Sequence, residues 1–267
     1  MNDVVFEANQ LQFSYNKYSD PILANVSCQI FSKKFTALVG PNGSGKSTLF
    51  KCLSGELVPN QGQVYFQGKN LLQLSSRKRA QKLSIVQQKN EAIPSLTVEE
   101  IVRMGRIPYR SFFSDYRQDP QDSAAVELAL ERVNLSSLRN EKIEHLSGGQ
   151  QQRVWLALAL AQEPEVILLD EPTTYLDIRF QLELLELLKQ LVDKEELTVC
   201  AVLHDLNQVM SYADETIVLN HGHIVEAGKT ETVLCSKLIK EVFSVSALQL
   251  RSSQKRKVLD LYLEEVQ

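Results

Sequence analysis

Long apolar runs and paired cysteines are missing from this 267-residue sequence, which also contains a single tryptophan. The longest apolar stretch, Val154–Ala161, is far shorter than the roughly 20 residues that a membrane-spanning helix needs. The four cysteines, Cys28, Cys52, Cys200 and Cys235, form no CxxC pair, so their spacing indicates neither a zinc site nor a disulfide framework. We expect buried structural thiols in a reducing compartment, and contact with a membrane only through a partner.

Strong charge of either sign is also missing, because the formal net charge is −4. This balance gives no electrostatic reason to expect a nucleic-acid partner. The short basic runs at residues 77–79 and 255–257 are expected to be solvated faces. Residues 1–10 lack the basic start and apolar run of a secretory signal.

Apolar periodicity predicts strands that alternate with helices. Residues 4–15 and 21–30 alternate apolar and polar side chains, which favours antiparallel strands. The buried-strand pattern is found at residues 35–39, 166–169 and 198–203, and residues 63–66 are a candidate for another short strand. The helical pattern is found at residues 47–54, 97 onward, 122–133, 147–162 and 181–192. Gly55 is the expected stop of the first helix. Such alternation predicts an α/β fold with a parallel central sheet, and the helical stretch from about residue 89 to 144 predicts an inserted all-helical lobe.

A glycine-rich octet separates the strand at residues 35–39 from the helix that follows it. Its residues are Gly40-Pro41-Asn42-Gly43-Ser44-Gly45-Lys46-Ser47, which fit the phosphate-loop pattern in the strand–helix context that the pattern requires. Glycines allow backbone N–H groups to surround an anion, and the helix N-terminus adds its positive end. We expect Lys46 to contact the β- and γ-phosphates and the Ser47 hydroxyl to ligate Mg²⁺. The alternative is a chance glycine-rich turn.

An acidic pair follows the apolar strand at residues 166–169. The strand should deliver Asp170 to its carboxyl end, where α/β sheets bind ligands, and there Asp170 could hold Mg²⁺. Glu171 could orient an attacking water or accept its proton. The alternative is a solvated acidic turn. The phosphate-loop motif in the same sequence favours the Mg²⁺ site over this alternative.

Other phosphate-loop classes fit less well. GTP-binding switches read their base with Asn-Lys-x-Asp, which this sequence lacks. Small-molecule kinases usually lack a second glycine-rich helix start, and this chain has one at Leu146-Ser147-Gly148-Gly149-Gln150. That helix start suits an anion but has no lysine of its own, so it indicates a segment that completes a phosphate site built elsewhere.

The order of these motifs, followed by His204, resembles the ABC-type ATPases over about residues 4–245. The resemblance implies a head-to-tail homodimer with two ATPs, each lying between the phosphate loop of one copy and Ser147, Gly148 and Gly149 of the other. It extends the nucleotide site to Thr48, Gln150 and Asp177, the last in a loop that crosses the dimer interface. It also implies that His204 contacts the γ-phosphate and that Lys46 and Glu171 are catalytic.

Two further positions take roles from the same resemblance. Tyr15 matches the aromatic that stacks on adenine; a core tyrosine is the alternative. Gln88 matches the glutamine that joins the core to the helical lobe, touches Mg²⁺ or the water, and relays the nucleotide state to the membrane partner. The implied cofactors are therefore ATP and Mg²⁺, with Ser47, Gln88 and Asp170 as the metal set.

Within the family, residues 170–177 resemble ATPases of importers for ferric siderophores, haem and cobalamin. Leu160-Ala161-Gln162 and Gly105-Arg106-Ile107-Pro108-Tyr109 favour the same subgroup. The resemblance implies an ATPase coupled to uptake of a metal chelate, a ferric siderophore first, with haem, cobalamin or another chelate as alternatives. A non-transport ABC ATPase of DNA repair or ribosomes, and a nucleotide-binding regulator that does not hydrolyse ATP, remain rival hypotheses.

The implied organisation is one ABC ATPase domain over residues 1–267. It has a P-loop NTPase core at about residues 1–88 and 154–245, with an N-terminal antiparallel β subdomain. The α-helical subdomain is inserted at about residues 89–153, and an extension of unknown role follows at about residues 246–267. The implied partners are a second copy, integral-membrane permease subunits and, indirectly, a substrate-binding protein, with no nucleic acid. The implied location is peripheral, on the cytoplasmic face of the inner membrane.

Overall fold

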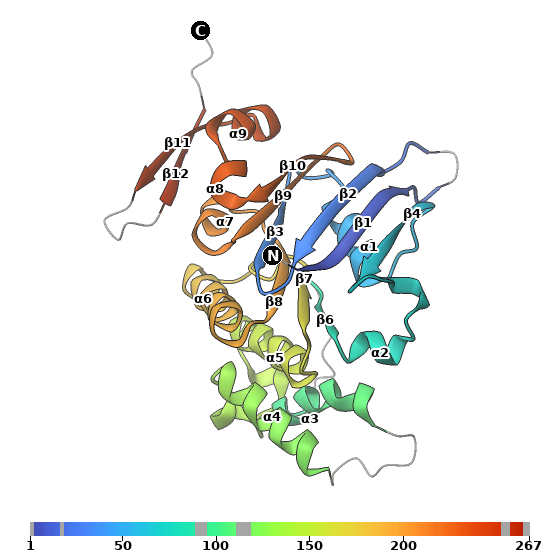
Figure 1. The fold of residues 1–267 in the computed structure, drawn as a ribbon. Coiled ribbons are helices and arrows are strands. Elements are labelled where there is room, and N and C mark those ends of the chain that lie inside the picture. The colour runs from blue at the N-terminus through green and yellow to red at the C-terminus, as the bar shows by residue number, and fades with distance from the viewer. Residues whose placement is uncertain (1–2, 17–18, 89–94, 111–118, 252–256, 264–267) are drawn as a thin grey trace. The chain divides into compact units, whose positions relative to one another are not determined.

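The computed structural model describes residues 3–16, 19–88, 95–110, 119–251 and 257–263 (Figure 1). The chain forms two compact units. The first consists of Met1–Gln73 with Leu188–Gln267, and the second of Leu74–Leu187.

In the part of the chain that the structure describes, the first unit contains strands of two larger sheets and a separate C-terminal hairpin. The strands of the larger sheets are β1 (Val4–Phe13), β2 (Leu23–Phe31), β3 (Phe35–Val39), β4 (Gln61–Phe66), β5 (Lys69–Asn70), β8 (Thr198–Val202), β9 (Glu215–Asn220) and β10 (His223–Lys229). One sheet has the order β2-β1-β4-β5 and is antiparallel throughout. In the other, β3 lies between β8 and β9 and is parallel to both, while β10 pairs antiparallel with β9. The antiparallel N-terminal strands and the parallel strand β8 are therefore confirmed.

The helices of this unit are short. They are α1 (Lys46–Ser54), η1 (Leu71–Gln73), α7 (Leu206–Tyr212), α8 (Thr230–Val233) and α9 (Ser236–Phe243). Helix α1 contacts both β1 and β8, so it joins the two sheets through its buried side chains. Its C-cap is Gly55 at φ 75°, a left-handed conformation that suits glycine, as predicted.

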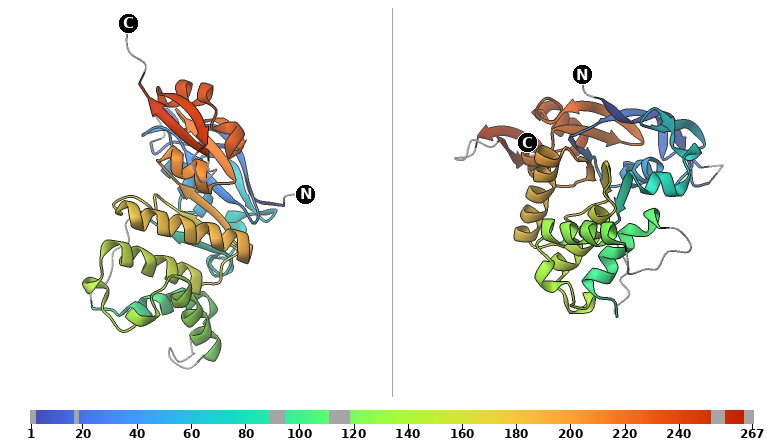
Figure 2. Two further views of the ribbon diagram at one scale, coloured as in Figure 1. Left: turned by 90° about the vertical axis from the view of Figure 1, so that its left-hand side faces the viewer. Right: turned by 60° about the horizontal axis from the view of Figure 1, so that its bottom comes forward.

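The C-terminal segment forms a hairpin of β11 (Ser246–Arg251) and β12 (Lys257–Tyr262) (Figure 2). The side chain of Asn207 in α7 fixes it, since Asn207 Nδ2 donates to Leu259 O at 3.0 Å and Leu259 N donates to Asn207 Oδ1 at 2.7 Å. Gln249 Nε2 adds a bond to Leu234 O at 2.9 Å. The hairpin is thus held to the first unit by paired backbone–side-chain bonds.

The second unit combines a strand pair with a helical group. Its elements are α2 (Ser76–Ala80), β6 (Leu83–Val86), α3 (Val98–Arg103), η2 (Met104–Tyr109), α4 (Pro120–Arg132), η3 (Ser136–Leu138), η4 (Ile143–His145), α5 (Gly148–Ala161), β7 (Val166–Leu169) and α6 (Ile178–Glu195). Strands β6 and β7 are parallel. Helices α3, α4 and α5 contact one another (Figure 2), so the predicted helical lobe is present within residues 98–161.

Local signals set most helix starts in this unit. Thr97 and Glu100 form a capping box at α3. Asp119 caps α4, with Pro120 in its first turn, where a missing N–H costs nothing.

Helix α6 is longer than predicted, and its unpredicted ends carry i,i+4 ion pairs between Arg179 and Glu183 at 2.8 Å and between Lys189 and Asp193 at 2.9 Å. The boundary between the two units falls inside α6.

Among the described residues, no helix has both the length and the apolar character required to cross a bilayer. The basic run at residues 77–79 is part of α2, which buries none of its residues. The second basic run lies mostly outside the described residues.

The cysteines divide into two classes. Cys28, Cys52 and Cys200 are buried, as predicted, whereas Cys235 is exposed, which corrects the prediction of four buried thiols. Cys235 is the N-cap of α9, and a cap residue at a surface turn is not covered by its own helix. Burial raises the pKa of Cys28 to about 12, of Cys52 to about 11 and of Cys200 to about 12.

We predict that one thiol, Cys235, reacts quickly with an aromatic disulfide reagent at pH 8. The thiolate is the attacking species, and a thiol with a pKa near 12 is ionised only to about one part in 10⁴ at that pH. The Cys235→Ser variant should lose the fast phase, and denaturant should expose the remaining thiols. A fast phase that survives in Cys235→Ser would contradict the burial described here.

Candidate functional site

The phosphate loop leaves the carboxyl end of a fully buried strand. Every side chain of β3 is buried, including its one polar residue, Thr36, so the first solvent-accessible polar groups come after Val39. Gly40 packs against strand β9, where an added Cβ would lie 2.0 Å from the carbonyl oxygen of Leu219. Its φ of 155° and this contact exclude any side chain at Gly40. Gly43, at φ 77°, has open space around the position of a Cβ, so its surroundings leave room for a ligand.

Lys46 lies at the start of α1 and is only 5 % exposed. Its ammonium donates to the carbonyl oxygens of Gly40 and Pro41, both at 2.8 Å. These bonds hold a positive charge over the loop, at the N-terminal end of the helix dipole. The arrangement concentrates positive potential where the sequence predicts a phosphate.

The remaining predicted residues of the loop differ in exposure. Asn42 and Ser47 are exposed, whereas Ser44 and Thr48 are buried. Within the described part of the chain, Ser44 Oγ is buried and has no hydrogen-bond partner. A buried hydroxyl without a partner is costly, and an oxyanion in the loop would satisfy it. The donors that are present therefore fit a phosphate group.

The acidic pair in the second unit follows β7, another strand that is buried along its whole length. Asp170 N donates to Val86 O at 2.9 Å, which extends the pairing of β7 with β6 by one residue. Glu171 comes next, at φ 49°, and this left-handed backbone turns the chain away from the strand direction. The two carboxylates are thus presented at the strand end in different directions.

Glu171 is held by two side chains. Gln88 Nε2 donates to Glu171 Oε2 at 2.6 Å, and Thr174 Oγ1 donates to the same oxygen at 3.2 Å. Gln88 and Glu171 were both predicted site residues, and the structure brings them together. Thr174 was not assigned a role, although it lies within the segment of residues 170–177 that resembles the importer ATPases. Only the three-dimensional turn shows that Thr174 orients the carboxylate.

The second glycine-rich segment begins helix α5. Ser147 is its N-cap, and the capping box with Gln150 joins Ser147 Oγ to Gln150 N at 3.4 Å and Gln150 Oε1 to Ser147 N at 2.9 Å. Gly148 is exposed, and a Cβ there would meet nothing within 4 Å. Gly149 is buried, and a Cβ there would lie 2.7 Å from the ring of Phe180. Packing therefore requires glycine at position 149 only, and Gln150 has a structural role in the cap.

The other predicted residues lie on exposed segments. Tyr15 is 62 % exposed and meets Phe13 edge-on, with ring centroids 4.9 Å apart, so the alternative of a core tyrosine is wrong. His204 is exposed and lies between the end of β8 and Asp205, which caps α7. Asp177 is exposed in the turn before α6. These three side chains are accessible to a ligand or a partner.

The two glycines of α5 generate a stability prediction. Gly149→Ala should lower the free energy of unfolding by about 1–3 kcal/mol, because the new methyl group must displace Phe180. Gly148→Ala should change it by less than about 0.5 kcal/mol, since its surroundings are open. Urea titration of both variants measures this difference. Equal effects of the two substitutions would contradict the packing described at Gly149.

Comparison with known proteins places this geometry in a family. The sequence profile of the ABC transporter family matches residues 23–174. The ferric enterobactin transport ATP-binding protein FepC of Escherichia coli (strain K12) is 38 % identical over 239 residues, which cover 90 % of this chain and 87 % of that protein. The iron(3+)-hydroxamate import ATP-binding protein FhuC of Bacillus subtilis (strain 168) is 39 % identical over 231 residues, covering 86 % and 85 %.

Solved structures agree with the sequence comparison. An inward-facing metal-chelate type ABC transporter is similar with a TM-score of 0.82 and 28 % identity, covering 98 % of this chain and 97 % of that chain. The dimeric bacterial ABC transporter cassette MJ0796 is similar with a TM-score of 0.73 and 30 % identity, covering 84 % and 98 %. The phosphate loop, the Gln88–Glu171 pair and the Ser147-capped helix thus lie in a chain that belongs to the ABC transporter family, as an ATP-binding and ATP-hydrolysing subunit.

Proposed function

We propose that this chain powers an ABC importer that takes up a metal chelate, a ferric siderophore in the first place. FepC and FhuC, which it resembles along most of their length, are ATP-binding proteins of ferric enterobactin transport and iron(3+)-hydroxamate import. The similar metal-chelate type transporter supports the same class of cargo. Haem, cobalamin or another chelate is the alternative cargo within this proposal.

The observation that carries the enzymatic part is the carboxylate of Glu171, which is fixed by Gln88 and Thr174 at the end of a buried strand. A general base needs a defined position close to the water that it activates. The two hydrogen bonds to Oε2 restrict the rotation of the carboxylate and so give it a defined position. Glu171 would therefore act as the base, and Gln88 and Thr174 as its positioning residues.

Residues of the first unit would supply the contacts to the phosphates and the adenine of ATP. The backbone N–H groups of the loop and the Lys46 ammonium would bind the β- and γ-phosphates, and Tyr15 would stack on adenine. The Ser47 hydroxyl, the Asp170 carboxylate and Gln88 offer the hard oxygen ligands that Mg²⁺ prefers. When bound, Mg²⁺ neutralises charge on the phosphate oxygens. His204 would contact the γ-phosphate.

The working form in this proposal is a homodimer attached to permease subunits. Ser147, Gly148 and Gly149 of one copy would contact the ATP of the other, with Thr48, Gln150 and Asp177 completing the site. The proposed domain partition is a core of about residues 1–88 and 154–245, a helical subdomain of about residues 89–153 and an extension of about residues 246–267. The chain would be peripheral to the inner membrane, on its cytoplasmic face, with a substrate-binding protein as an indirect partner.

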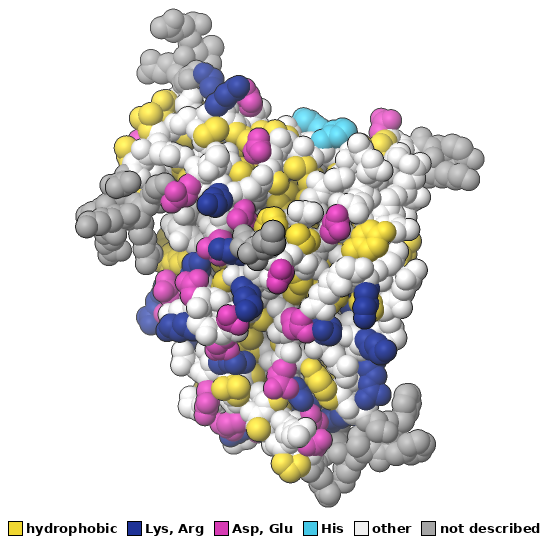
Figure 3. Space-filling view, viewed as in Figure 1, with side chains coloured by type: hydrophobic (Ala, Val, Ile, Leu, Met, Phe, Trp, Pro, Cys, Tyr) yellow, Lys and Arg dark blue, Asp and Glu magenta, His cyan; other side chains and the backbone are white. Residues whose placement is uncertain are grey.

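The charge balance gives no support for a nucleic-acid partner, because the formal net charge is −4. On the face drawn in Figure 3, Asp and Glu side chains lie among the Lys and Arg side chains over much of the surface, and a short row of Lys and Arg side chains runs down its right-hand side.

We predict that Glu171→Gln retains ATP binding and lowers steady-state ATP hydrolysis by at least about 100-fold, within the range for losing a general base. With ATP and Mg²⁺ it should accumulate as a dimer, which light scattering after size exclusion would detect. Glu165→Gln is the matched control, because Glu165 pairs with Lys82 on the surface of the same unit at 2.6 Å. Wild-type turnover by Glu171→Gln would remove Glu171 from the mechanism.

We also predict that Gly148→Ala hydrolyses ATP at least about 10-fold more slowly than wild type while remaining as stable. Its Cβ meets nothing in the chain, so a loss would arise from close approach to a phosphate. Full ATPase activity in Gly148→Ala would contradict the proposed contact of Gly148 with ATP.

Co-purification of the tagged chain with a polytopic membrane protein tests the transport part. Capture of ribosomes instead would favour a non-transport ATPase.

A further inference from the structure

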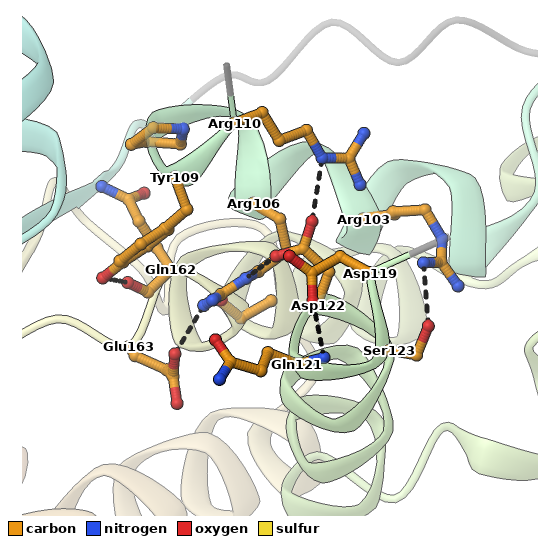
Figure 4. Close-up of polar contacts among 12 residues, drawn as sticks. Arg103, Arg106, Tyr109, Arg110, Asp119, Gln121, Asp122, Ser123, Gln162 and Glu163 are labelled. Carbon is orange, nitrogen blue, oxygen red and sulfur yellow. Dashed lines mark hydrogen bonds and ion pairs between the residues drawn. The ribbon is translucent and has the colours of Figure 1, made fainter. Parts of the chain in front are cut away.

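Two sequence motifs that are 50 residues apart lie against each other in the second unit (Figure 4). They are Gly105–Tyr109, which forms most of η2, and Leu160–Gln162 at the end of α5. At Gly105 an added Cβ would lie 2.3 Å from the carbonyl oxygen of Leu158. Only glycine permits so close an approach of the two backbones, so η2 packs directly against the last turn of α5.

Arg106 is the centre of the contact and is only 4 % exposed. Its Nε donates to Asp122 Oδ1 at 2.8 Å, and its Nη1 donates to Ala161 O at 2.7 Å and to Glu163 Oε2 at 2.6 Å. The guanidinium also lies over the ring of Tyr109, 4.1 Å from its centroid. One side chain thus joins η2, the start of α4 and the end of α5 (Figure 4).

The contact satisfies the carbonyl groups that a helix leaves open at its C-terminus. Arg106 Nη1 donates to Ala161 O, and Tyr109 OH donates to Gln162 O at 2.9 Å. A cation at this end is also favoured by the helix dipole. Arg106 and Tyr109 therefore form a C-terminal cap for α5 that is supplied by a distant segment.

The carboxylate of Asp122 is bound on both oxygens. Arg110 Nε donates to Asp122 Oδ2 at 2.9 Å, opposite the bond from Arg106 to Oδ1. Burial alone would raise the pKa of Asp122, but the hydrogen bonds from Arg106 and Arg110 outweigh it and hold the pKa below its usual value. Asp122 is thus a fixed anion at neutral pH, and it holds both arginines in place.

Helix α5 is held at its C-terminal end by Arg106 and Tyr109 from a distant segment. Its N-terminal end carries the Ser147–Gln150 capping box, whose bonds lie within the helix start itself. Its 14 residues span roughly 21 Å at 1.5 Å per residue. If the C-terminal end of a helix of this length shifts, the helix tilts and its N-terminal end moves as well. Ser147 and Gly148 lie at that N-terminal end.

We propose that Arg106 is a positioning residue for the ATPase reaction: by fixing the C-terminal end of α5, it sets where Ser147, Gly148 and Gly149 stand. The role rests on the proposed function, in which these three residues meet the γ-phosphate. Misplacement of a binding group by about 1 Å can lower a rate 100-fold. Arg106 does not itself contact nucleotide in this account.

The test compares Arg106→Lys with Arg139→Lys in the full-length chain. A lysine ammonium cannot reproduce the planar fork that meets Asp122, Ala161 O and Glu163 together. Arg139 is a matched control, since it pairs within the same unit with Glu99 of α3 at 3.0 Å and Glu127 of α4 at 2.7 Å, and neither partner lies on α5. Arg106→Lys should lower kcat for ATP at least about 10-fold and leave KM within about 2-fold. Arg139→Lys should change both by less than about 2-fold.

A second measurement determines the position of α5 independently of ATP hydrolysis. Spin labels at Ser147→Cys and at Glu131→Cys in α4, in a Cys235→Ser background, report the distance between the two helices. Arg106→Lys should broaden or shift the distance distribution, and Arg139→Lys should leave it unchanged. A distribution unaltered by Arg106→Lys, or kcat losses equal in both variants at equal thermal stability, would overturn the positioning role. Failure of the proposed function would show differently, as absence of ATP hydrolysis by the wild type with the distance effect of Arg106→Lys intact.

Discussion

Complete burial of strand β3 in the first unit and of strand β7 in the second is the constraint on which the placement of the functional groups depends. Strands β3 and β7 carry no exposed side chain, and Thr36 in β3 is their one polar residue. A charged group along either strand would have a large desolvation cost, so the charged groups are confined to the strand ends. The phosphate loop with Lys46 follows β3, and Asp170 with Glu171 follows β7. The same burial that stabilises each unit thus fixes where its chemistry can occur.

Close backbone contact supplies the second requirement, which is precision. Gly40 meets the carbonyl of Leu219, and Gly105 meets the carbonyl of Leu158; neither contact tolerates a side chain. Each brings two segments together more closely than any side-chain packing allows. Around them, charged groups are fixed by several bonds each: Lys46 by two loop carbonyls, Glu171 by Gln88 and Thr174, and Arg106 by three acceptors. Functional groups with so many restraints need little reorganisation when a ligand binds.

The sequence was most informative where the cause of structure is local. The phosphate loop, the Gly55 stop of α1 and the Ser147 start of α5 depend on residues within a few positions of one another, so their patterns predict them directly. The role of Gln88 at Mg²⁺ or the water followed only from family resemblance, and its hydrogen bond to Glu171 was not predicted. That bond, the contact of Gly105 with α5 and the bridging role of Arg106 depend on residues far apart in sequence that meet only after folding. The bond from Thr174 to Glu171 is local, but the residue types alone do not show it. The exposure of Cys235 was missed for the same reason, because burial is a property of the neighbourhood and not of the residue type.

The central claim is that the loop at residues 40–48 and the helix start at residues 147–150 bind the same triphosphate from different copies of the chain. Amide hydrogen exchange, measured on the Glu171→Gln protein with ATP and Mg²⁺ over a range of protein concentrations, tests this claim directly. The account predicts that protection at residues 40–48 follows ATP occupancy, and that protection at residues 147–150 rises only as the dimer forms. Protection of the loop without any protection of residues 147–150, in a sample shown to be dimeric, would contradict it.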